Sequence, residues 1–140
     1  MKKLFLFAST ALLASTLFLA SCSKTDDPAT SPSTAAPRDR FHGNWYIQEN
    51  SSVNGTSSYY VTIADSTNAS YISFGYLYGF TKKTYATFNG NNFTFPSQQP
   101  NPGYIVTGSG RLSNSNRIDM TYIVWSGSSN YDTLKCVLTK

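Results

Sequence analysis

The sequence predicts an all-β fold, an antiparallel meander of about eight short strands that forms a small barrel or half-open barrel. Aromatic residues make up 15% of the 140 residues, whereas charged residues make up only 13%. After residue 36, Ala is almost absent and Leu is scarce, so the chain is poor in good helix formers. Clusters of Gly, Asn and Ser recur at strand-length spacing, and Tyr, Val, Ile and Thr are frequent between them.

Eight segments have the composition of strands and are separated by polar turns. They are Asn44–Glu49, Ser58–Asp65, Ser70–Gly75, Thr84–Asn89, Phe93–Phe95, Gly103–Leu112, Arg117–Trp125 and Tyr131–Leu138. Because the connections are short, a meander is favoured over a sandwich with long crossovers. The longest irregular stretches, Tyr76–Lys83 and Pro96–Pro102, are expected at the strand ends, where binding loops usually lie.

Alternation within the strands predicts which side chains point inward. One face of the segment from Arg117 to Trp125 carries the apolar residues Ile118, Met120, Tyr122 and Val124. Ile123 and Trp125 make the opposite face partly apolar as well. Two explanations stay open, a closed barrel with aromatic residues on its outside, and a sheet whose aromatic outer surface contacts a partner.

The N-terminal segment is typical of a secretory signal peptide. Lys2 and Lys3 precede an apolar run from Leu4 to Ala20, and small residues stand before Cys22. The run is at the short end of the membrane-spanning range and contains Ser and Thr, so a cleaved signal is favoured over a spanning helix. We therefore expect residues 1–21 to be removed.

Leu19-Ala20-Ser21-Cys22 resembles the lipobox of bacterial lipoproteins. The resemblance implies that Cys22 carries acyl chains such as palmitate, which hold the protein on a membrane. Ser23 after the cysteine implies the outer membrane, and Ser23–Asp27 resembles a surface-export signal of Bacteroidota lipoproteins. The expected location is the cell-surface side of the outer membrane, with its periplasmic face as the alternative.

Residues 22–40 are expected to form a disordered tether, and residues 41–140 the folded domain. The tether contains three Pro and many Ser, Thr and Ala without apolar periodicity. From Cys22 onward, nine Lys and Arg stand against seven Asp and Glu, a formal net charge of +2. The basic residues are scattered rather than gathered in a stripe, so we expect no nucleic-acid partner.

At the start of the domain, Phe41-x-Gly43-x-Trp45-Tyr46 resembles the opening of the lipocalins. In that family the Trp of the first strand plugs the closed end of a β-barrel, and a basic residue late in the chain packs on it. The resemblance implies this role for Trp45, with Lys135 or Arg117 as the basic residue. The alternative is simply a strand that begins with Gly and buries a Trp.

The domain as a whole resembles small lipocalin-like lipoproteins of Bacteroidota, a family without a known function. The resembling stretches are Phe41–Ile47, Tyr60–Ile63, Phe93–Pro96 with Gln98, Gly103–Gly110 and Ile118–Tyr122. Some relatives have a Cys just after the first strand, where this chain has Asn50-Ser51-Ser52. Cys136 is therefore expected to be a buried free thiol.

The domain lacks the patterns of an enzyme. His42 is the only His and stands outside any metal-ligand or nucleophile motif. No Gly-x-Ser-x-Gly motif is present, and the spacing of the domain carboxylates Glu49, Asp65, Asp119 and Asp132 selects no catalytic pair. We expect no enzymatic activity, no cofactor and no metal.

Two binding functions stay open. In the first, inward-facing side chains line a cavity for an apolar small molecule, as in lipocalins; they are Trp45, Tyr59, Val61, Ile63, Phe88, Phe95, Met120 and Tyr122. In the second, the barrel is filled, and exposed Tyr76, Tyr78 and Phe80 stack on a glycan or dock a protein partner. These three residues can instead fold onto the barrel end as a plug.

Overall fold

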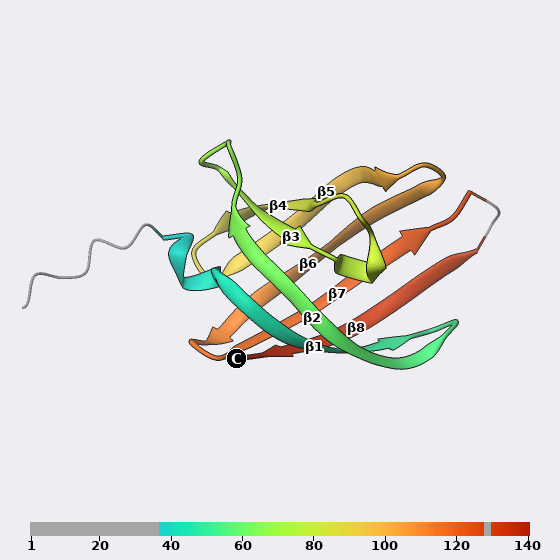
Figure 1. Cartoon of the computed structure of the whole chain (residues 1–140), viewed down its shortest axis with the longest axis horizontal. Helices are drawn as coiled ribbons and strands as arrows, with labels where there is room; N and C mark the ends of the chain where they lie inside the picture. The colour runs from blue at the N-terminus through green and yellow to red at the C-terminus, as the bar shows by residue number, and fades with distance from the viewer. Residues whose placement is uncertain (1–36, 128–129) are drawn as a thin grey trace, which may run out of the picture. The chain divides into compact units, whose positions relative to one another are not determined.

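Eight antiparallel strands follow one another in chain order, and the last pairs with the first to close a barrel (Figure 1). This computed structural model describes residues 37–127 and 130–140. The expected signal peptide, Cys22 and most of the expected tether lie outside these residues. The strands are β1 Gly43–Ser51, β2 Gly55–Asp65, β3 Tyr71–Gly75, β4 Thr84–Asn89, β5 Asn92–Asn101, β6 Tyr104–Asn114, β7 Arg117–Trp125 and β8 Tyr131–Thr139. The predicted all-β meander is therefore confirmed, and its barrel is closed.

Alternation along the strands separates a buried interior from an exposed outer face. In β1 the inward side chains are those of Trp45, Ile47, Glu49 and Ser51, and the residues between them are exposed. β8 shows the same period of two, with Leu134, Cys136 and Leu138 pointing inward. Within residues 37–127 and 130–140, no helix has the length and apolar character needed to cross a membrane.

One end of the barrel is sealed by the short helix η1, Asp39–Phe41, and by the indole of Trp45. The ring of Phe41 is fully buried and packs edge-on against Phe93, with centroids 5.9 Å apart. The indole N–H of Trp45 donates a hydrogen bond of 2.8 Å to the Phe41 carbonyl. We call this the closed end, and the buried Trp45 lies where the resemblance to the lipocalins implied.

The basic residue on Trp45 is Lys140. Its Nζ lies 4.4 Å from the centroid of the indole ring and donates a 2.6 Å hydrogen bond to the His42 carbonyl. Lys135 and Arg117, the residues expected in this role, do not take it. Lys135 points outward from β8, and the guanidinium of Arg117 pairs with Asp119 at 2.6 Å.

The folded part begins before the expected boundary at Phe41. Arg38 forms an ion pair of 2.7 Å with Asp65 at the end of β2. Arg40 donates to the Pro37 carbonyl through Nε, at 2.6 Å, and to the Asn91 side chain through Nη1. These contacts fix the point at which the chain enters the barrel, beside the closed end (Figure 1).

Aromatic rings form a continuous column through the barrel interior. From the closed end, Phe41, Phe93, Phe74, Phe95, Tyr122, Tyr78, Phe80 and Tyr104 each lie within 4.8–6.5 Å of the next ring centroid. All seven contacts are edge-to-face or tilted, the geometries that aromatic pairs prefer. The column contains eight of the eighteen aromatic residues between Phe41 and Lys140.

Strand β5 is longer than predicted, because it continues through Pro96 and Pro100 to Asn101. A proline has no N–H for the ladder, and the pairing with β6 shifts register twice in this stretch. On the side of β5 that faces β4, the Gln98 side chain replaces the missing backbone hydrogen bonds. Its amide accepts from the Tyr85 N–H at 2.7 Å and donates to the Tyr85 carbonyl at 2.6 Å, so the side chain replaces a strand partner.

Two glycines of β6 let its backbone approach β7 closely. A Cβ on Gly108 would lie 2.5 Å from the Thr121 carbonyl oxygen and 2.6 Å from the Tyr122 Cα. At Gly110, the inward space is filled by the Phe93 ring. Gly108 and Gly110 therefore provide the close strand contact and leave room for the aromatic column.

We expect Gly108→Ala to lower the free energy of unfolding by about 1–3 kcal/mol, because its Cβ would overlap backbone atoms of β7. Chemical denaturation followed by tryptophan fluorescence measures the change. Gly75→Ala is the matched control, since its Cβ would lie 3.7 Å from the nearest atom. Equal effects of the two substitutions would contradict this account of Gly108.

Candidate functional site

The inward side chains of β1 change from apolar to polar along the strand. Trp45 and Ile47 lie toward the closed end, whereas Glu49 and Ser51 lie toward the opposite end. We call this opposite end the mouth; it is formed by the β1–β2 and β5–β6 turns, residues 76–83 and the adjoining ends of β7 and β8. Two carboxylates are buried there, Glu49 with 6% of its surface exposed and Asp132 with 5%.

Glu49 is held by three hydroxyl groups. Tyr122 and Tyr59 donate to its Oε2 at 2.7 and 2.8 Å, and Ser57 donates to its Oε1 at 3.1 Å. Among the described residues, no Lys, Arg or His forms an ion pair with this carboxylate. Hydroxyl donors therefore take the place of a basic partner inside the barrel.

The surroundings of Glu49 keep its neighbours protonated. Burial, followed by the charge of Glu49, raises the pKa of Tyr59 and the pKa of the Cys136 thiol. The pKa of Tyr122 is raised by burial first and then by Tyr59 and Glu49. At neutral pH both phenols therefore remain hydrogen-bond donors, and the thiol is a poor nucleophile.

Asp132 collects hydrogen bonds at the mouth. The Ser51 hydroxyl lies 2.7 Å from both of its carboxylate oxygens, and Asn54 and Tyr78 donate to Oδ2 at 3.3 and 3.1 Å. Burial acts to raise the pKa of Asp132, but the donors, led by Ser51 and Tyr78, outweigh it and hold the pKa below its usual range. The carboxylate is therefore charged at neutral pH.

Tyr78 joins the two carboxylate clusters. Its N–H donates to the Tyr59 hydroxyl at 2.8 Å, and its own hydroxyl donates to Asp132. Burial and this hydrogen bond raise the pKa of Tyr78 to about 12. Its φ of 55° lies in the left-handed region that residues other than Gly rarely adopt, and the two hydrogen bonds hold the residue in this strained backbone conformation.

A pocket of about 660 Å³ opens at the mouth beside Asp132. Its lining residues are Val53, Asn54, Tyr78, Tyr104, Val124, Ser126, Asn130, Tyr131 and Asp132. Three tyrosine rings, two amides and a hydroxyl thus face one space with a single carboxylate, and the described lining includes no basic side chain. This mouth pocket suits a ligand that has both ring faces and hydrogen-bonding groups.

The residues expected to line an apolar cavity come together as a packed core. Trp45, Val61, Ile63, Phe95 and Tyr122 are at most 1% exposed, and Met120 is 4% exposed. Tyr59 and Phe88 are half-buried and pack against the same cluster. None of the eight lines the mouth pocket.

The three aromatic residues expected on a surface loop have different positions. Tyr76 is 66% exposed, and Tyr78 is half-buried and lines the mouth pocket. Phe80 is only 3% exposed, which corrects the expectation that it lies on the surface. Its ring is buried because it packs between Tyr78 and Tyr104, at centroid distances of 5.3 and 5.6 Å.

The sequence analysis missed most of the residues of the mouth pocket, including Asn54, Tyr104 and Tyr131. They come from separate turns and strand ends, which no local motif connects. One sequence signal could have predicted that Glu49 and Asp132 are buried. Glu49 shares the inward face of β1 with Ile47, and Asp132 shares that of β8 with Leu134, so the alternation placed an acid at an interior position of both strands.

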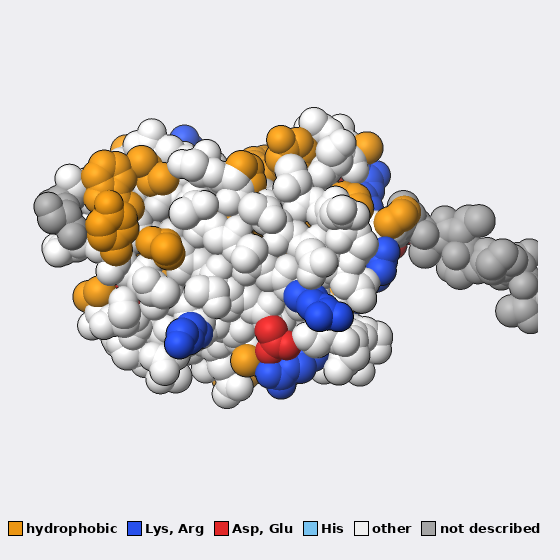
Figure 2. Space-filling view, turned by 180° about the vertical axis from the view of Figure 1, so that it is seen from behind, with side chains coloured by type: hydrophobic (Ala, Val, Ile, Leu, Met, Phe, Trp, Pro, Cys, Tyr) orange, Lys and Arg blue, Asp and Glu red, His pale blue; other side chains and the backbone are white. Residues whose placement is uncertain are grey.

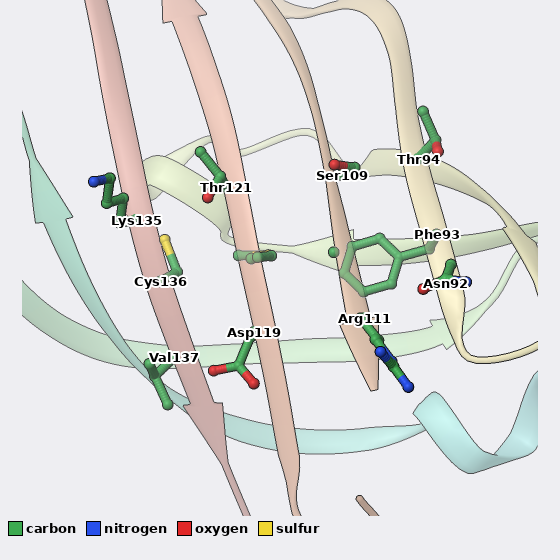
Figure 3. A pocket seen from close by; sticks show the side chains of 12 residues that line it. Asn92, Phe93, Thr94, Ser109, Arg111, Asp119, Thr121, Lys135, Cys136 and Val137 are labelled. Atoms are coloured by element: carbon green, nitrogen blue, oxygen red, sulfur yellow. The ribbon is translucent and has the colours of Figure 1, made fainter. Parts of the chain in front are cut away.

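A second hollow, of about 620 Å³, lies on the outer face of β5 to β8 (Figure 3). Figure 3 shows Thr94, Ser109 and Thr121 side by side on β5, β6 and β7. Asp119 in this hollow is paired with Arg117, whose hydrogen bonds hold the pKa of that carboxyl below its usual range. Phe93 is the one aromatic residue of this lining, and its ring is only 1% exposed, so the hollow presents no open aromatic face to a ligand.

At the closed end, Asp39, His42 and Asp65 have ligand atoms within 4.8 Å of one another. In the sequence, His42 stands outside any metal-ligand motif, and the fold brings it to these two acids. Asp65 also pairs with the guanidinium of Arg38 at 2.7 Å. The group is therefore an ion-pair cluster that attaches η1 to the end of β2.

The comparisons with known proteins agree with the barrel and do not assign a family. The chain matches no protein-family model and no curated protein. It is similar to a redesigned β-barrel, with 13% identity and a TM-score of 0.56 over 74% of this chain and 94% of that chain. It is also similar to EF1p2_mFAP2b bound to DFHBI, with 10% identity and a TM-score of 0.53 over 74% of this chain and 98% of that chain. At these identities the likeness shows the fold alone.

We expect Asp132→Asn to lower the free energy of unfolding at pH 7 by about 1–3 kcal/mol, because hydrogen bonds to a charged, buried acceptor are lost. Since the pKa of Asp132 is lower in the folded than in the unfolded state, its stabilisation is present above the unfolded pKa and is lost as the pH falls through the folded pKa. The difference between the two proteins should therefore shrink below about pH 4.

Urea denaturation between pH 3 and pH 7 measures this difference. Asp119→Asn is the control, because it removes a carboxylate in an exposed ion pair and should cost about 0–1 kcal/mol. The role of Asp132 at the mouth would be contradicted if Asp132→Asn lowered the free energy of unfolding no more than Asp119→Asn does. It would also be contradicted if the effect of Asp132→Asn did not change with pH.

Proposed function

We propose that this protein is an exported, lipid-anchored binding module that takes a neutral glycan at the mouth of its barrel. The observation that carries the proposal is the mouth pocket, in which tyrosine rings and hydrogen-bonding groups share one space. A sugar ring presents C–H faces that stack on aromatic rings and hydroxyl groups that bond to amides and carboxylates. The pocket offers both kinds of contact.

The hydrogen bonds of Asp132 indicate which residues of the pocket position others and which contact the ligand. Ser51, Ser52, Asn54 and Tyr78 already donate to its two oxygens. Asp132 therefore acts mainly by fixing the Tyr78 ring and the Asn54 amide in place. Ligand contacts then come from the tyrosine rings and from the polar groups of Asn54, Ser126 and Asn130, which lose little freedom on binding where they are already held.

The charge of the pocket favours a neutral ligand. Asp132 is the one charged residue of the described lining, and Glu49 lies deeper in the same end of the barrel. An anionic ligand, such as an uronic acid or a free fatty acid, would meet like charge without a basic partner. A neutral sugar avoids that repulsion.

The direction of the barrel supports display away from a membrane. The chain enters at the closed end, and the mouth lies at the opposite end of the strands (Figure 1). If Cys22 carries the lipid, fourteen residues, 23–36, separate the anchor from Pro37. Fully extended, they span about 50 Å, so the mouth can face solvent at a distance from the lipid.

An apolar small molecule inside the barrel is the second candidate. It is favoured by the similarity to EF1p2_mFAP2b, a barrel that was solved with DFHBI bound. Here the ligand would have to displace part of the aromatic column, which includes Phe95 and Tyr122. The mouth pocket needs no such rearrangement, and we therefore place it first.

Native mass spectrometry of the fragment Arg38–Lys140, titrated with neutral oligosaccharides and with fatty acids, tests both candidates. We expect sugar adducts, and we expect Tyr104→Ala to weaken them about tenfold, because an aromatic contact at the mouth is lost. Tyr46→Ala is the matched control. The two tyrosines are 38% and 37% exposed, and each packs on one aromatic ring, but Tyr46 lies on the outer face of β1.

The outcomes separate the two candidates. Sugar binding that the control retains and Tyr104→Ala weakens supports the mouth pocket. A retained or added fatty acid, with no sugar adduct, favours the interior carrier instead. A protein that takes up neither ligand would leave both proposals without support and would overturn the glycan-binding function.

The anchoring proposal is tested by Cys22→Ser in the full-length protein, expressed in a Gram-negative host that lipidates its lipoproteins. We expect the wild type to partition with membranes and to carry acyl mass on Cys22, since two or three acyl chains give stable anchoring. The variant should lose both properties. Acylation that persists in Cys22→Ser would contradict the assignment of the lipid site.

A further inference from the structure

We infer that the bound glycan is an oligomer whose chain leaves the mouth across Tyr131 and continues in an apolar groove on the outside of the barrel. This inference rests on the function proposed for the mouth pocket. It names the ligand class more narrowly, as a chain with at least one sugar ring beyond those held at the mouth.

The outer groove has a volume of about 250 Å³ and lies at the mouth end of β6 and β7. Its lining residues are Ile105, Thr107, Ile123, Trp125 and Tyr131. They occupy neighbouring positions, because Trp125 is paired with both Ile105 and Tyr131, and Ile123 is paired with Thr107. Figure 2 shows hydrophobic side chains gathered at the mouth end of this face of the molecule.

The apolar character of this groove is a local departure from the outer surface around it. Toward the closed end, the next outward positions on β6 and β7 are Ser109 and Thr121, followed by Arg111 and Asp119. Polar outward residues therefore also allow β6 and β7 to pair, so the fold does not require apolar residues on the outer face. Ile123 and Trp125 are the residues that blurred the alternation in the sequence, and a binding surface accounts for them.

Tyr131 connects the groove to the mouth pocket. It is 64% exposed, and it lines both hollows. At the end of β7, the consecutive residues Val124 and Trp125 likewise belong to the mouth pocket and to the groove respectively. A ligand too long for the mouth pocket therefore meets the groove directly across the rim of the barrel.

The chemistry of the groove fits sugar rings. It offers the rings of Trp125 and Tyr131 for stacking, and its described lining carries no charge. The Thr107 hydroxyl donates to the Phe95 carbonyl at 3.2 Å and can accept a hydrogen bond from a sugar hydroxyl. It also lies at the mouth end, far from the point where the chain enters the barrel (Figure 1). A neutral oligosaccharide that already occupies the mouth is therefore the occupant we assign to it.

Isothermal titration of the full-length protein in detergent, with glucose, xylose, mannose and N-acetylglucosamine oligomers of one to six units, tests the inference. We expect the longer members of one series to bind about tenfold more tightly than the shorter ones. Trp125→Ala should remove this gain with length and leave the Kd of the short sugars unchanged. Tyr60→Ala, which removes a 68% exposed tyrosine from β2, should change neither value.

Ile123→Thr provides a second variant if Trp125→Ala lowers the yield of folded protein, since threonine is the residue found at the outward position 121 of the same strand. Thermal melting confirms that each variant is folded. The role of the outer groove would be overturned if both variants kept the increase in affinity with oligomer length. It would also be overturned if a protein that binds short sugars showed no such increase. Either result would leave the function proposed for the mouth pocket intact. A protein that binds no sugar of any length would overturn both.

Discussion

The pairing of β1 with β8 is the constraint on which the rest of the structure depends. Because these strands join, the sheet has a fixed circumference, and everything inside must fit a narrow lumen. Aromatic rings fill that lumen as one column, and the inward glycines of β6 make room for it. A barrel packed in this way has little interior to offer to a ligand. Its usable concave surface is displaced to the rim, where the column ends at Tyr78, Phe80 and Tyr104.

The polar half of the interior follows from the same geometry. Glu49 and Asp132 point inward because their strands alternate, and hydroxyl donors rather than basic residues satisfy them. A buried carboxylate is costly unless it is hydrogen-bonded, and at Asp132 the hydroxyl donors hold the pKa of the carboxyl below its usual range. Tyr78 connects the two clusters and stays in a left-handed backbone conformation. These contacts fix the side chains of the rim in one arrangement, and such pre-organisation would lower the entropic cost of the proposed binding.

Local signals in the sequence predicted the order and number of the strands, and the resemblance of the motif around Trp45 to the lipocalins implied the plug of the closed end. The alternation around Met120 and the turns rich in Gly and Asn predicted the meander. Errors arose where a distant contact decides the outcome. Lys140 rather than Lys135 reaches Trp45, and Gln98 sustains β5 beyond Pro96. The mouth pocket could not be predicted from the sequence either, because Asn54, Tyr104 and Asp132 meet only after the barrel has closed.

The Cys136 thiol is a natural probe for the opening of the closed barrel. It is buried and free, and it lies on the inward face of β8 opposite Met120 and Glu49. Burial and the nearby carboxylate keep it protonated, so a thiol reagent reaches a reactive sulfur only in molecules whose strands have separated. The labelling rate of this one atom therefore reports how often the barrel opens under native conditions, without a denaturant or an introduced probe.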